Sequence, residues 1–305
     1  MKKLGPNTAA SVREKLLQMS RASGRPNVEL LDRYCIERLL YRLSKSRHRE
    51  RFVLKGALML LVWGGGSVQR VTRDADLLGL GESSIPALVT AFKDICLTEV
   101  EDDGVVFDAD SVEGDSIRAM EEYSGVRLHL KARLGSALVR VQVDVGFGDA
   151  FNPVESEFPT ILDFPSPLLR MYSRENSVAE KFEAMVRLGM ANSRMKDYFD
   201  IWHLSRSFEF DGKELGKSIR ATFKRRKTEL PSGVLLGLAE EFSNDKVKQT
   251  QWRAFWKKSV RQEPVPELPE VVAVVREFVM LPCEESFKGH WTAGGPWVRE
   301  TKTAK

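Results

Sequence analysis

Residues 71–80 read Val71-Thr72-Arg73-Asp74-Ala75-Asp76-Leu77-Leu78-Gly79-Leu80. Apolar residues flank the two acidic ones, which is typical of a strand, and successive side chains of a strand alternate between its two faces. Asp74 and Asp76 therefore lie on the same face. Two carboxylates this close repel each other unless a cation lies between them, and protein usually holds Mg²⁺ through one or two carboxylates plus substrate phosphates. The pair is a candidate metal site.

A hairpin further along the chain offers a third carboxylate. Residues 126–134 and 137–145 alternate apolar and polar side chains, and the glycine and serine between them predict a tight turn. Asp144 projects from the face opposite the valines of its strand. An antiparallel neighbour would bring Asp144 next to Asp74 and Asp76, and the alternative is an ordinary solvent-facing residue. Three carboxylates with Mg²⁺ between them would suit a displacement at phosphorus.

Helical periodicity dominates the rest of the chain, so the sequence predicts an α+β protein. Helices are expected before the first strand, and a segment rich in proline follows residue 149. Beyond this connector every periodic segment has a helical pattern. We therefore expect a sheet-containing domain with N-terminal helices over residues 1–155, a helical domain over 156–287, and a loose tail over 288–305.

Length and composition agree with this division. A chain of 305 residues corresponds to about two domains at roughly 150 residues each. Its three cysteines are widely spaced, which supports neither a disulfide framework nor a zinc site. No apolar run reaches the roughly 18 residues of a membrane span, and no signal-like apolar segment follows the first residues. We expect a cytoplasmic protein that does not enter the membrane.

Charge is strongly segregated behind a net charge of +4. Residues 1–73 hold 16 Lys and Arg against 5 Asp and Glu, residues 74–123 hold 2 against 14, and residues 206–261 hold 14 against 7. Basic segments predict a polyanionic partner such as RNA, whereas the acidic block is expected mainly to solvate a surface. The densest basic cluster is Lys224-Arg225-Arg226-Lys227, whose alternative role is a solvated helix end. A second candidate docking surface consists of Arg42, Lys45, Arg47, Arg49 and Arg51.

Four motifs in this order resemble those of the AbiEii/AbiGii nucleotidyltransferase toxin family, which includes the MenT toxins. They are RFVLKGA at 51–57, RVTRDADLL at 70–78, SVAEKFEA at 177–184 and NSRMKDYFD at 192–200. The resemblance covers roughly residues 10–260. It implies a DNA-polymerase-β-like nucleotidyltransferase domain with a mixed sheet, and a C-terminal helical domain that closes over the site.

The resemblance also implies roles for individual residues. The expected metal ligands are Asp74, Asp76 and Asp144, and the expected catalytic residues are Asp74, Asp76, Lys181 and Asp197. The expected nucleotide-binding residues are Lys55, Gly56, Ala57, Lys181, Arg194 and Lys196. Gly56 would let backbone N–H groups approach the phosphates. The family usually has glycine or serine at the next position, so Ala57 leaves phosphate positioning to backbone amides.

The implied activity is Mg²⁺-dependent transfer of a nucleoside monophosphate from an NTP to an RNA hydroxyl. The 3′ acceptor end of tRNA is the expected site, where added nucleotides would block translation, and an antitoxin protein is the expected partner. One alternative is an enzyme that nucleotidylates protein side chains. The other is a non-catalytic nucleic-acid-binding module on the same fold.

Overall fold

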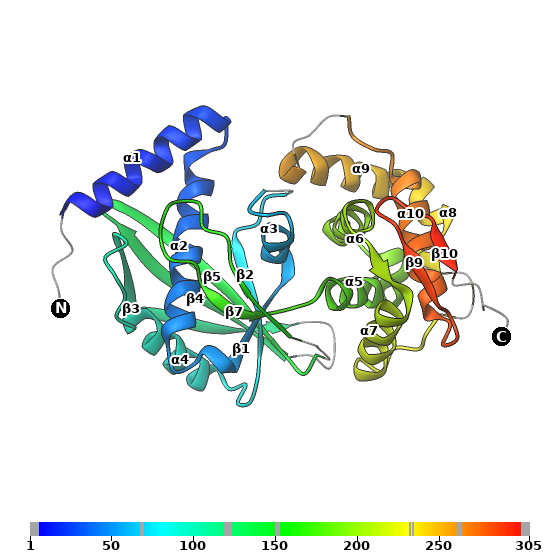
Figure 1. The fold of residues 1–305 in the computed structure, drawn as a ribbon, viewed down its shortest axis with the longest axis horizontal. Coiled ribbons are helices and arrows are strands. Elements are labelled where there is room, and N and C mark those ends of the chain that lie inside the picture. Colours follow the sequence, from blue (N-terminus) through cyan, green and yellow to red (C-terminus); the bar gives the residue numbers. More distant parts are fainter. Residues whose placement is uncertain are drawn as a thin grey trace, which may run out of the picture. The chain divides into compact units, whose positions relative to one another are not determined.

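The computed structural model describes residues 6–67, 70–118, 124–149, 153–231, 233, 235–260 and 264–299. The chain forms two compact units (Figure 1). Unit 1 comprises Met1–Gly148 and Pro153–Met171, and unit 2 comprises Asp149–Asn152 and Tyr172–Lys305. None of the helices in the described ranges is long and apolar enough to cross a membrane.

Unit 1 is built on a mixed sheet. In its described part seven strands follow the order β3-β4-β5-β2-β1-β7-β6. Neighbouring strands are antiparallel, except that β2 runs parallel to β5 and β1 runs parallel to β7. The strands are β1 (Phe52–Lys55), β2 (Asp74–Gly79), β3 (Val105–Arg118), β4 (Ser124–Leu134), β5 (Ala137–Phe147), β6 (Val154–Glu157) and β7 (Leu168–Met171). The predicted α+β class and mixed sheet are confirmed.

Helices cover one face of this sheet. They are α1 (Pro6–Ser23), α2 (Asn27–Lys45), α3 (Met59–Trp63) and α4 (Ile85–Leu97). Figure 1 shows α2 and α4 crossing the strands, and α2 contacts β5 while α4 contacts β3. Alternate residues of β4 and β5 point into this core and are buried, namely Val126, Leu128, Leu130, Ala132, Val139, Val141, Val143 and Val145. The residues between them face away from the core, as the period of two predicts.

Two cations of the basic N-terminal segment are part of the core. Arg42 donates to both carboxylate oxygens of Asp103, at 2.7 and 3.1 Å, and to the Val105 carbonyl. Arg38 is fully buried and donates to the Pro165 carbonyl. These guanidinium groups join α2 to the loops that follow α4 and β6, so they are not available to a partner.

Unit 2 is mainly helical. Its helices are α5 (Arg174–Leu188), α6 (Met195–Ser207), α7 (Gly212–Arg225), α8 (Glu240–Asn244), α9 (Lys246–Phe255) and α10 (Leu268–Met280). Its strands are β8 (Phe210–Asp211), β9 (Gly289–Trp291) and β10 (Trp297–Arg299), which form a small antiparallel sheet in the order β10-β9-β8. Trp252 and Trp256 are buried among the aromatic rings around α6 and α9.

The boundaries differ from those predicted at residues 155 and 288. Strands β6 and β7 belong to the sheet of unit 1, because β7 pairs with β1, so unit 1 extends to Met171. The prolines of this segment separate short strands rather than domains. The described part of the predicted loose tail is ordered by burial of its aromatic residues. Trp291 is only 1% exposed and its indole N–H donates to the Ser205 carbonyl at 2.7 Å.

We expect Asp103→Ala to lower the free energy of unfolding by about 3 kcal/mol, because Arg42 would remain buried without its carboxylate partner. Urea denaturation followed by circular dichroism measures the change. Asp102→Ala is the matched control, since this neighbouring carboxylate is exposed, and it should cost less than about 1 kcal/mol. Equal losses in the two variants would contradict a stabilising role for the buried ion pair.

Candidate functional site

Four strands of unit 1 bring four charged side chains into one row across the sheet. Lys55 on β1 pairs with Asp76 on β2, Asp76 pairs with Asp144 on β5, and Asp144 pairs with Arg127 on β4. Paired residues project from the same face of a sheet. The row therefore has a cation at each end and two carboxylates between them. Asp74 adds a third carboxylate to this face, which we call the site face.

Burial of the opposite face fixes this arrangement. Ala75 and Leu77 alternate with the carboxylates of β2 and are each only 1% exposed. Asp74 and Asp76 are partly buried on the other side. A register shift of one residue would place a carboxylate in the core, which is strongly unfavourable. The hydrophobic core thus determines where the acidic pair lies.

Gly56 lies directly against the carboxylate of Asp76. It follows β1, begins a 3₁₀ turn over Gly56–Leu58, and has a φ of +73°, a conformation that favours glycine. A Cβ atom placed on it would lie 2.6 Å from both Cβ and Cγ of Asp76 and would collide with Oδ2. The next residue, Ala57, is buried. The absence of a side chain at Gly56 therefore makes room for the Asp76 carboxylate, a role that the motif alone does not reveal.

Asp144 forms a bidentate ion pair with Arg127. Arg127 donates from Nε to Oδ1 at 2.9 Å and from Nη2 to Oδ2 at 2.7 Å, and Gln142 also donates to Oδ1 at 3.2 Å. The hydrogen bonds to Asp144 raise the pKa of Arg127, and the negative charges of Asp144, Asp74 and Asp76 raise it further. Arg127 is therefore a fixed cation beside the acidic pair.

This ion pair involves one of the three predicted metal ligands, and the assignment of Asp144 to a metal stays a prediction. In the part of the chain that the structure describes, no group of three or more His, Cys, Asp or Glu side chains is arranged to hold a metal ion. The strand that carries Asp144 runs parallel to β2, not antiparallel as expected, and Arg127 holds the Asp144 carboxylate. Asp74 and Asp76 lie on the same face of the sheet as Asp144. Two carboxylates are the number that Mg²⁺ takes from protein when substrate phosphates complete its coordination, so this pair fits the ion.

The predicted residues of unit 2 come from α5, α6 and the turn before α6. Lys181 forms an ion pair with Asp200, with Nζ 3.3 Å from Oδ2. Asp197 lies in the first turn of α6 and is only 1% exposed. Arg194 donates to its Oδ2 atom, whereas its buried Oδ1 atom has no hydrogen-bond partner. Lys196 is exposed. The structure thus joins Lys181 to Asp200 and Arg194 to Asp197.

The predicted basic cluster at 224–227 is partly structural. Arg226 contacts three carboxylates of unit 2, with N–O distances of 2.9 Å to Asp149, 3.5 Å to Glu180 and 2.9 Å to Glu183. Burial alone would lower the pKa of Arg226, but the negative charges of Glu180 and Asp149, and the hydrogen bonds that Arg226 donates to Glu183 and Asp149, outweigh it and raise this pKa. Arg226 therefore stabilises unit 2 and does not belong to an RNA-binding surface.

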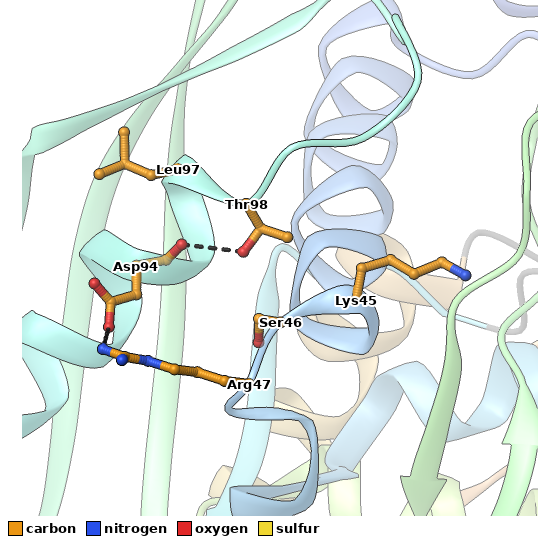
Figure 2. Close-up of a pocket in the computed structure, with 6 residues that line it drawn as sticks. All are labelled: Lys45, Ser46, Arg47, Asp94, Leu97 and Thr98. Atoms are coloured by element: carbon orange, nitrogen blue, oxygen red, sulfur yellow. Dashed lines mark hydrogen bonds and ion pairs between the residues drawn. The ribbon is translucent and has the colours of Figure 1, made fainter.

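The second predicted docking surface surrounds a pocket of unit 1 at the ends of α2 and α4. Six residues line this cavity of about 410 Å³ (Figure 2): Lys45, Ser46, Arg47, Asp94, Leu97 and Thr98. In the pocket Arg47 forms an ion pair with Asp94. Outside the pocket Nη2 of Arg49 lies 2.6 Å from Oε2 of Glu155. Like Arg42, both cations are paired within the chain. None of the residues predicted to bind the nucleotide or a metal lines this pocket.

Sequence reasoning missed Arg127, although the sequence carried a signal for it. The two-residue turn after Leu134 sets the register of the hairpin, so Leu134 pairs with Ala137. Counting back seven residues from Leu134 and forward seven from Ala137 gives Arg127 and Asp144. Opposite charges directly across a hairpin attract. The ion pair was therefore predictable from the turn.

A pair of strand carboxylates beside a glycine turn suits a nucleotidyltransferase, in which the protein holds Mg²⁺ and the phosphates of a nucleotide. Comparison with protein families agrees with this class. Residues 38–274 match the family described as nucleotidyl transferase AbiEii toxin, Type IV TA system. The chain therefore belongs to the AbiEii family of toxin nucleotidyltransferases, and the family implies a nucleotide substrate and an antitoxin partner.

Two solved structures from Helicobacter pylori resemble the chain. One is described as a candidate nucleotidyltransferase and the other as JHP933. Each is 13% identical to this chain with a TM-score of 0.42 and covers 82% of it, corresponding to 95% of the first protein and 93% of the second. No curated protein matches the sequence.

We expect Gly56→Ala to reduce nucleotide transfer roughly hundredfold, because the added Cβ must displace the Asp76 carboxylate and misplacement by about 1 Å can cost that much. Gly65→Ala is the matched control. Gly65 also has a positive φ, of +58°, but a Cβ there meets no atom within 4 Å. Initial transfer rates and thermal unfolding separate the two effects. If both variants lose the same activity, backbone strain rather than displacement of Asp76 is responsible.

Proposed function

We propose that this toxin transfers a nucleoside monophosphate from an NTP to an RNA hydroxyl in the cytoplasm, with release of pyrophosphate. The acceptor is the 3′ end of tRNA, and its modification prevents aminoacylation and thereby blocks translation. The observation that carries the proposal is the charged row of the site face, with Asp74 and Asp76 next to the Gly56 turn.

In this proposal Asp74 and Asp76 hold Mg²⁺ together with the triphosphate. When bound, Mg²⁺ would supply a lower pKa for the attacking hydroxyl and charge neutralisation for the leaving pyrophosphate. The backbone of the Gly56 turn lies on the β1 side of the pair and binds the phosphates there, with Ala57 contributing its backbone N–H. The ammonium group of Lys55 extends toward Gly146 of β5 and adds positive charge to the site face. In an in-line displacement the nucleophile and the leaving group lie on opposite sides of the phosphorus. The acceptor hydroxyl therefore approaches from the β5 side, where Asp144 holds Arg127 in place.

The residues of unit 2 act on the nucleotide in the same proposal. Lys181 supplies a positive charge to the triphosphate and exchanges its contact with Asp200 for the phosphate oxygens. Asp197 offers an unsatisfied buried oxygen to a donor group of the substrate. Arg194, which fixes Asp197, and the exposed Lys196 add positive charge for the phosphates.

Incubation with each radiolabelled NTP and Mg²⁺, in the presence of total tRNA or of total protein, tests the function. We expect label on tRNA with the wild-type chain. Asp74→Asn and Asp76→Asn should each reduce the rate about a thousandfold or more, because each removes a metal ligand and several kcal/mol of transition-state stabilisation. Label on protein would favour the protein-nucleotidylating alternative. No label on either, with RNA binding retained, would favour a non-catalytic binding module.

Lys181→Ala should raise the KM for the NTP at least about tenfold, because the substrate would lose a charge-assisted contact, while the KM for RNA stays unchanged. Titration of each substrate at a saturating level of the other measures both constants. Lys213→Ala, at an exposed lysine of α7, is the control and should change neither constant. A selective rise in the KM for RNA would move Lys181 to the acceptor-binding surface.

A further inference from the structure

A group of cations lies on the site face beyond Arg127. Lys131 and Arg133 on β4 and Arg140 on β5 form this group, which we call the hairpin cation cluster. They alternate with buried core residues and share the face of Arg127 and Asp144. All three side chains are exposed. The cluster is therefore an outward-facing extension of the candidate site within unit 1.

None of these three side chains forms an ion pair with any residue in the described ranges. This distinguishes them from Arg42, Arg47, Arg49 and Arg226, which are paired within the chain. Lys131 and Arg140 are also direct partners across the hairpin. Like charges in that position destabilise a sheet, so the free chain carries a repulsion that a bound anion would relieve.

Strand β3 carries acidic side chains next to the hairpin cation cluster. Its Asp108 pairs in register with Lys131, although the two side chains form no ion pair, and Asp115 pairs with Arg127. Phosphates would be repelled by this edge and drawn toward the middle of the β4–β5 hairpin. Leu138 is exposed and pairs with Arg133 near the turn of the hairpin, at the end of the cluster that is farthest from Asp144.

The spacing of the cluster suits a chain of phosphates better than a single anion. At about 3.3 Å per residue of strand, Arg140 lies roughly 13 Å from Asp144, and Arg133 lies roughly 20 Å from Arg127. Asp74 pairs with Gln142, so along the strands Arg140 lies about 7 Å and Arg133 about 13 Å beyond it, and the cluster extends outward from the acidic pair. A flexible polyanion can contact both ends of the cluster and still reach the carboxylates.

We propose that the hairpin cation cluster binds the phosphate backbone of the single-stranded acceptor RNA and directs its end toward the Asp144 side of the carboxylate pair. The proposal rests on the proposed function, because it assumes an RNA acceptor. It differs from the two docking surfaces that the sequence predicted, in which Arg42, Arg47, Arg49 and Arg226 are paired within the chain. The cluster contributes affinity without sequence preference, since phosphate contacts carry no base information.

The test compares two triple variants that lose the same charge. The first is Lys131→Gln, Arg133→Gln and Arg140→Gln, and the control is Lys224→Gln, Arg225→Gln and Lys227→Gln in unit 2. Fluorescence anisotropy with a labelled single-stranded RNA, repeated over a range of salt concentrations, gives affinity and salt dependence. The hairpin variant should bind about tenfold more weakly or worse and lose roughly 2 from its salt slope, at about 0.7 per contact on single strands. The control should bind like the wild type.

Transfer kinetics complete the test. The hairpin variant should show a raised KM for RNA, an unchanged KM for the NTP and an unchanged rate at saturating RNA. Its melting temperature should not fall, because the substitutions are exposed and remove the repulsion between Lys131 and Arg140. If the wild type labels RNA but the hairpin variant binds RNA normally, the cluster assignment fails while the proposed function stands. Equal weakening in both triple variants would also overturn it, as a general effect of net charge. If the wild type neither binds nor labels RNA, both proposals fail.

Discussion

Strand β2 is bonded antiparallel to β1 and parallel to β5, and the site depends on the register of these two ladders. The register places Lys55, Asp76, Asp144 and Arg127 in one row and keeps the intervening residues in the core. Because the side-chain period of a strand is two, the core and the carboxylates are specified together. A substitution that loosens the packing beneath β2 would therefore disturb the acidic pair without touching it.

The cations at the two ends of the row explain why the sheet tolerates three carboxylates on one face. Arg127 neutralises Asp144 through two hydrogen bonds, and Lys55 is the direct partner of Asp76. Repulsion among the carboxylates is thereby reduced before any ligand binds. Asp144 in turn holds the Arg127 guanidinium in a fixed position on the site face.

Alternation in sequence was sufficient to predict β2 and the β4–β5 hairpin, because apolar residues occupy every second position there. It was insufficient for β3. A bulge between Asp108 and Glu113 interrupts the period, and acidic residues fill the outward positions, so the segment has the composition of a loop. The basic segments were visible, but a charge tally does not reveal that the buried Arg42 and the half-buried Arg226 are held in ion pairs. Nor does the Gly56 motif reveal its contact with Asp76, which joins residues 20 positions apart.

The chain enters unit 2 at Asp149 and returns to unit 1 at Pro153, so the two units are not separated at a single position in the sequence. Asp149 belongs to unit 2, where Arg226 binds it, yet the following strands β6 and β7 return to the sheet of unit 1. A fragment that ends at Gly148 would lack strands β6 and β7 of its sheet. A fragment that ends at Met171 would contain Asp149, and the remaining unit 2 would lose this carboxylate partner of Arg226. No single cut yields two intact pieces. An exchange of either unit between related proteins would therefore need two junctions in the chain instead of one.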